Sequence, residues 1–137
     1  MNNNTIVLKS KGHHEEGTAT AAIKPGQPLE YLAGDKQYGI ASDDATSFLV
    51  AKEDALQGRT VRDAYAAEER VFAYQPLPGD VILGVVPVGT AVTEGAAVGI
   101  AGGEFVTDAG VVIGKFYETL NDGAATTEEE LVPIRIS

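Results

Sequence analysis

Residues 17–51, GTATAAIKPGQPLEYLAGDKQYGIASDDATSFLVA, decide the fold. Their β-prone runs are only a few residues long, and Gly, Pro or Asp interrupts them at short intervals. Lys24-Pro25-Gly26-Gln27 has the pattern of a type II turn, because proline presets φ at the first central position and glycine takes the positive φ at the second. Short strands with turns at this spacing predict a barrel or a sandwich rather than an α/β fold.

The second half of the chain has the same character. Residues 81–86 are a continuous apolar run, as expected of a strand buried on both faces, and Pro87 either ends that strand or places it at a sheet edge. A Gly-rich turn at 102–103 and an acidic loop at 121–130 separate further short strands. Residues 131–136 alternate by twos, so we expect this last strand to be docked in the sheet.

One short helix is expected over residues 60–70. Thr60 is a suitable N-cap, and the apolar residues that follow it give a partial helical stripe, enough for a turn or two.

Residues 1–16 differ from the rest of the chain. The β-prone run Thr5-Ile6-Val7-Leu8 is followed by polar residues, and an isolated four-residue strand is not stable by itself. We therefore expect this run either to pair with the sheet of its own domain or to add to the edge of a partner's sheet. The prediction is a mainly β chain, a small β-barrel or β-sandwich-like domain with one short helix over 17–137 and an extended N-terminal arm over 1–16.

Length and composition narrow the class of protein. The 137 residues suit one domain, or one domain with an arm, and there is no cysteine for a disulfide, a thiolate metal site or a cysteine nucleophile. The start of the sequence lacks the pattern of a signal peptide, and no apolar run approaches the roughly 20 residues that span a bilayer. We expect a protein kept or assembled in the cytoplasm, without a membrane partner.

The net charge of −10, from 20 acidic and 10 basic residues, argues against direct binding to nucleic acid. Neutralisation of phosphates by a basic face supplies most of the affinity of such binders. The same negative charge keeps a protein soluble and repels anionic surfaces.

The sequence predicts no metal, cofactor or catalytic site. His13-His14-Glu15-Glu16 is the densest group of possible metal ligands, but adjacent residues of an extended arm point to opposite sides. Both histidines lie in the arm, away from any Ser and Asp that could complete a triad. Residues 99–103 lack the Gly-Lys-Ser/Thr ending of a phosphate loop and are interpreted as a tight turn. Asp43-Asp44 and residues 128–130 are interpreted as solvated loop charges.

Lys115 invites comparison with a lipoyl or biotinyl lysine, because Gly114-Lys115 lies among short β-prone runs. The lysine falls inside an expected strand rather than at a hairpin tip, so a surface lysine is the favoured interpretation. A carrier module stays as an alternative hypothesis.

Several stretches together resemble small head-decoration (cement) proteins of tailed bacteriophages, and they cover most of residues 20–136. They are TAAIKPGQPLEY at 20–31, FLVAKEDALQGRTV at 48–61, YAAEERV at 65–71, PGDV at 78–81, and the Gly-rich segment at 95–103.

The resemblance implies a non-enzymatic β-barrel-like domain on the outer surface of an icosahedral head, made in the bacterial host cytoplasm. Such proteins cover seams between capsomers and stiffen the shell, with the major capsid protein as partner and self-association as a trimer favoured over a dimer. The family has no catalytic motif to transfer. Another virion structural protein, such as a tail or adhesin component, stays as a second alternative hypothesis. We expect the arm residues Thr5, Ile6, Val7 and Leu8 to bind the capsid by adding a strand to an exposed sheet edge.

Overall fold

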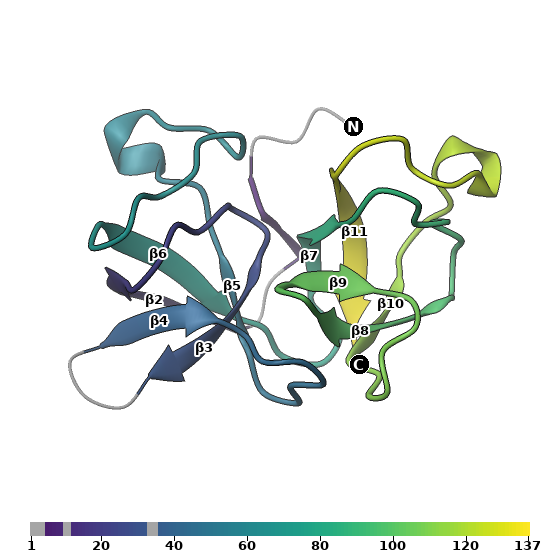
Figure 1. The fold of residues 1–137 in the computed structure, drawn as a ribbon, viewed down its shortest axis with the longest axis horizontal. Coiled ribbons are helices and arrows are strands. Elements are labelled where there is room, and N and C mark those ends of the chain that lie inside the picture. The colour runs from purple at the N-terminus through teal and green to yellow at the C-terminus, as the bar shows by residue number, and fades with distance from the viewer. Residues whose placement is uncertain (1–4, 10–11, 33–35) are drawn as a thin grey trace.

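The computed structural model describes residues 5–9, 12–32 and 36–137, which form two β lobes side by side (Figure 1). The first lobe is a closed barrel. In barrel order its strands are β2 (His13–Ala19), β4 (Gln37–Ile40), β3 (Pro28–Leu32), β5 (Leu49–Ala51) and β6 (Arg70–Gln75). Strand β2 closes the barrel, because it pairs in parallel with β4 and antiparallel with β6.

The second lobe is a six-stranded sheet that curls on itself. Phe105 of its last strand packs over Gly84, where an added Cβ would lie 2.6 Å from the phenyl ring. The prediction of a mainly β fold with a small barrel is therefore confirmed. The strand order is β1 (Val7–Lys9), β7 (Val81–Val86), β11 (Glu130–Ile136), β10 (Gly114–Phe116), β8 (Ala97–Ala101) and β9 (Glu104–Val106).

The short helix predicted over 60–70 is wrong. The described residues contain two 3₁₀ turns instead, η1 (Ala55–Gln57) and η2 (Asn121–Gly123). Tyr65 lies in a β-bridge with Ile23, and the two residues exchange backbone hydrogen bonds of 3.0 and 2.7 Å. The Tyr65 ring is buried, and burial of an aromatic ring outweighs the weak preference of a partial helical stripe. None of the helical segments in the described ranges is long and apolar enough to cross a membrane.

The N-terminal run is an edge strand of the second lobe. Ile6 is buried, its carbonyl accepts a 2.7 Å hydrogen bond from the Leu83 N–H, and Val7 pairs with Ile82 in β7. Residues 13–16, predicted to belong to the arm, form the start of barrel strand β2 instead. Residues 1–4 and 10–11 of the arm lie outside the described residues. From β1 in the second lobe the chain passes through the barrel strands and then returns to the second lobe at β7 (Figure 1).

The strand predicted over 81–86 is β7, in which every residue is buried, and it ends before Pro87. It lies between β1 and β11. The last strand is docked as expected, since β11 pairs with β7 on one side and with β10 on the other.

One of the two hydrophobic core clusters contains residues of both lobes, and the other belongs to the first lobe alone. The Phe48 ring of the first lobe meets the Phe105 ring of the second edge to face, with 5.8 Å between centroids. The predicted type II turn is present, with Gly26 at φ 91° and a 3.1 Å hydrogen bond from Gln27 N–H to the Lys24 carbonyl. This turn packs on the second lobe, because the Val85 N–H donates to the Gly26 carbonyl at 3.0 Å. The turn therefore fixes the lobes relative to each other.

Candidate binding surfaces

A groove of about 910 Å³ lies where the lobes meet. Pro25, Val85 and Leu131 contribute to its apolar floor. One wall is the segment 60–62 of the first lobe, and the other is formed by residues 120–121 and 128–130 of the second. We call this site the interlobe groove.

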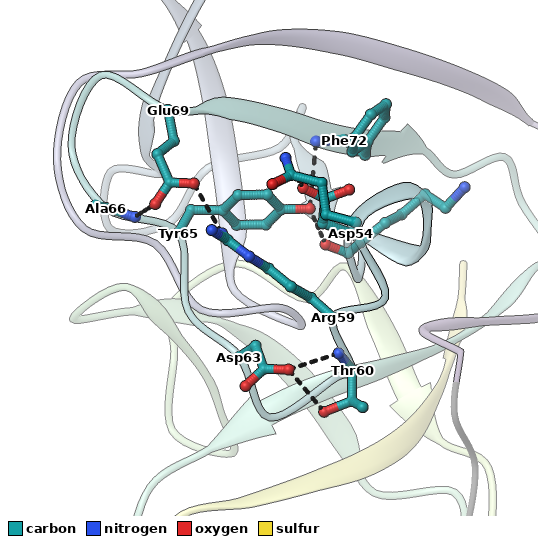
Figure 2. Close-up of polar contacts among 10 residues, drawn as sticks. Asp54, Arg59, Thr60, Asp63, Tyr65, Ala66, Glu69 and Phe72 are labelled. Atoms are coloured by element: carbon teal, nitrogen blue, oxygen red, sulfur yellow. Dashed lines mark hydrogen bonds and ion pairs between the residues drawn. The ribbon is translucent and has the colours of Figure 1, made fainter.

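A β-turn presents the first wall to the groove. The Asp63 N–H donates to the Thr60 carbonyl at 3.1 Å, and the Asp63 carboxylate accepts 2.7 and 3.2 Å hydrogen bonds from the Thr60 N–H and hydroxyl (Figure 2). Val61 and Arg62 stand at the two central positions of this turn and line the groove. Within the described part of the chain the Arg62 guanidinium makes no ion pair.

Tyr65 anchors the long connection between β5 and β6, which carries this turn. Its hydroxyl donates a 2.6 Å hydrogen bond to the Lys52 carbonyl and accepts a 3.4 Å one from the Phe72 N–H (Figure 2). Burial raises the pKa of Tyr65 to about 12. The phenol therefore stays protonated at neutral pH and keeps its role as a donor to Lys52.

A partly exposed ion pair closes the same connection. The Glu69 carboxylate accepts a 2.8 Å hydrogen bond from the Ala66 N–H and lies 2.7 Å from the Arg59 guanidinium (Figure 2). Both contacts lower the pKa of Glu69, and the backbone hydrogen bond from Ala66 is the largest single cause. Together with Tyr65, this pair holds the segment around the 60–63 turn in one conformation.

Two buried threonines hold the opposite wall. The Thr126 hydroxyl accepts from the Thr90 N–H at 3.1 Å and donates to the Pro87 carbonyl at 2.9 Å. The Thr126 N–H in turn donates to the Thr90 carbonyl at 2.9 Å. A backbone bond of 3.1 Å from Leu120 to Val92 fixes the other end of the loop. This loop is the acidic segment predicted over 121–130.

The groove is richer in carboxylates than in cations at its second wall. Glu128, Glu129 and Glu130 follow one another, and Lys24 of the first lobe pairs with Glu129 at 2.9 Å. Burial raises the pKa of the neighbouring Glu104, and a hydrogen bond with Glu129 raises it further. Protonation of Glu104 is thus favoured first by its burial and then by the nearby Glu129 carboxylate.

The structure places the four predicted arm residues beside the lobe junction. Thr5 is exposed, Ile6 is buried, and Val7 and Leu8 are half-buried. The Ile6 N–H donates to the Glu53 carboxylate at 3.1 Å. Capsid binding by these residues stays a prediction, and a partner would meet them as part of an edge strand.

The other candidates from the sequence do not come together. His14 lies against the Tyr74 ring, with its Nδ1 atom 2.8 Å from the Lys52 ammonium, and burial and that charge lower its pKa. The described residues hold no group of three or more His, Cys, Asp or Glu side chains placed to bind a metal. Lys115 is exposed in the middle of β10.

Sequence reasoning missed the interlobe groove. Its residues come from the 24–27 turn, the 60–63 turn, strand β7 and the 120–131 segment, and none of these segments indicates a groove by its own sequence. The nearest signal was the acidic run at 128–130, which was interpreted as solvated charge.

No protein-family model and no curated protein matches the sequence. Among solved structures, the chain is similar to the N base of head fiber gp8.5 in bacteriophage phi29, with a TM-score of 0.58 and 16% sequence identity. The two proteins share a fold. The match covers 93% of this chain and 95% of the head fiber base, so it includes both lobes and not the barrel alone. The head fiber base is a phage head protein, the setting that the sequence resemblance indicated.

Proposed function

We propose that this chain is a structural protein of a tailed-phage head, bound to the outer surface of the shell, where it stabilises the capsid lattice. The observation that carries the proposal is the shared fold with the phi29 head fiber base across both lobes. The resemblance of residues 20–136 to head-decoration proteins supports it independently. The major capsid protein is the proposed partner, and a trimer is favoured over a dimer.

The stabilisation follows from mass action. A protein that binds the assembled shell and not its dissociated subunits shifts the equilibrium toward the shell, and many copies on a lattice add their effects. The net charge of −10 suits an outer surface, since it disfavours contact with the packaged DNA.

Heads assembled without this protein test the proposal. Purified chain is added, and bound protein is measured by cosedimentation, together with the temperature at which the heads release DNA. We expect saturable binding and a higher release temperature. Heads that neither retain the chain nor gain heat resistance would refute the function. Sedimentation velocity of the free chain tests the trimer.

The proposed role of residues 5–8 has its own test. Because the chain contains no cysteine, Thr5→Cys can be labelled uniquely with a bulky maleimide. Thr5 is exposed, so the label leaves the fold intact while it blocks the β1 edge. The matched control is labelled Val88→Cys, at a position 63% exposed on another loop. Equal head binding by both labelled proteins would argue against the arm.

A further inference from the structure

We propose that the interlobe groove binds an extended segment of a partner protein in which apolar and basic side chains alternate. This inference rests on the proposed function, which makes the capsid protein the partner, and it names the surface and the chemistry of the contact.

The apolar lining of the groove, which extends from its floor onto both walls, favours an apolar ligand. Val61, Leu120 and Leu131 are hydrophobic residues packed against the buried core, and each keeps part of its side chain open to solvent. They face the groove from both lobes. Apolar side chains of a ligand that pack against this lining would bury the exposed parts of Val61, Leu120 and Leu131.

The second wall selects basic side chains. Glu128 and Glu130 have no ion-pair partner within the described ranges, and Glu129 has Lys24. A phosphate backbone would instead be repelled, which disfavours a nucleic acid as the occupant.

The arrangement of floor and wall suits an extended chain. Successive side chains of a strand point to opposite sides. A segment laid along the groove therefore directs alternate residues to the floor and the others toward the glutamates. Arg62, on the first wall, is placed to donate hydrogen bonds to carbonyl oxygens of such a segment.

Charge reversal tests the acidic wall. Glu128→Lys changes an exposed groove residue, and Glu94→Lys makes the same change at an exposed turn outside the groove. With heads of the encoding phage, we expect Glu128→Lys to weaken binding by about tenfold and Glu94→Lys by much less. Thermal melts of both variants confirm that they are folded. If wild type and Glu128→Lys bind heads equally, the groove proposal fails while the proposed function stands.

A peptide probe tests the groove without heads. Fluorescein-labelled peptides of about seven residues, alternating Lys with Val or Glu with Val, are titrated by fluorescence anisotropy; this length spans a typical strand. We expect the lysine peptide to bind wild type, to bind Glu128→Lys several-fold more weakly, and the glutamate peptide not to bind. No binding of the lysine peptide to wild type would overturn the groove, whatever the result with heads.

Photo-cross-linking identifies the occupant. A benzoylphenylalanine replaces Val61 in the groove or, as the control, Val88 outside it. After irradiation with heads, we expect a capsid peptide with alternating basic and apolar residues to be attached at 61 and not at 88. Attachment of 61 to the same chain or to a second copy of it would refute a capsid segment as the occupant.

Discussion

Replacement of Gly26 by alanine, compared with the same change at Gly79, separates the cost of a positive φ from the cost of a steric clash at the lobe junction. Gly26 and Gly79 occupy the same place in two similar turns, after Pro25 and Pro78, with φ of 91° and 93°. Each glycine N–H donates a 2.8 Å hydrogen bond to a carbonyl elsewhere in the fold. The two positions differ in their surroundings: a Cβ at Gly79 meets nothing within 4 Å, whereas one at Gly26 collides with Leu131 and comes within 3.1 Å of Val85.

The expected magnitudes follow from that difference. Alanine at a positive φ costs about 1–2 kcal/mol of folding free energy, so Gly79→Ala should lose that much. Gly26→Ala loses the same amount and, because the lobe junction is overpacked, about 1–3 kcal/mol more. The second effect acts on the contact between turn and sheet that fixes the lobes.

Urea unfolding followed by circular dichroism measures both variants against wild type. We expect the same slope and two midpoints below that of wild type, with Gly26→Ala the lower. Equal losses of stability in the two variants would refute the close approach at the junction. A loss near zero for Gly79→Ala would refute the conformational part of the reasoning.

Three further predictions concern buried or partly buried polar groups. Asp80→Ala should cost about 3 kcal/mol in a thermal or urea melt, because the buried Asp80 carboxylate accepts a 2.6 Å hydrogen bond from the Tyr74 hydroxyl, and a loss below about 1 kcal/mol would contradict this. Glu104→Gln should stabilise the fold at neutral pH. Because the pKa of Glu104 is raised in the folded state, the stability of wild type falls as pH rises from the unfolded toward the folded pKa. The advantage of the variant over wild type should therefore vanish below about pH 4. Tyr65→Phe should cost about 1–2 kcal/mol through the lost bond to Lys52. Burial raises the pKa of both Tyr38 and Tyr65 to about 12, so the variant should lose one of these two ionisations from the ultraviolet titration, and an unchanged amplitude there would contradict the assignment to Tyr65.

The parts of the fold that sequence predicted correctly depend on neighbouring residues. The Pro25-Gly26 pair sets its own turn through the φ preferences of the two residues. The continuous apolar run over 81–86 is sufficient to indicate a strand buried on both faces, and β7 is that strand.

The parts that sequence missed depend on distant partners. The 60–70 segment has a weak helical pattern, but Tyr65 pairs with the distant residue Ile23 in a bridge outside the named strands, and nothing near either residue in the sequence indicates this pairing. The groove likewise needs Lys24, Val61 and Leu131 to meet across the two lobes. Hydrophobic alternation and turn-forming residues cannot predict such long-range contacts, because they describe only local geometry.

The pairing of β1 with β7 has a consequence for synthesis. The ribosome releases Val7 before the barrel strands, and its partner Ile82 follows only after the whole barrel has been made. All barrel strands, from residue 13 to residue 75, are therefore available before the second sheet can acquire its edge. A nascent chain halted near residue 75 would carry β1 without its partner strand β7, so the second lobe is complete only when strands as far apart in sequence as β1 and β11 have both been made.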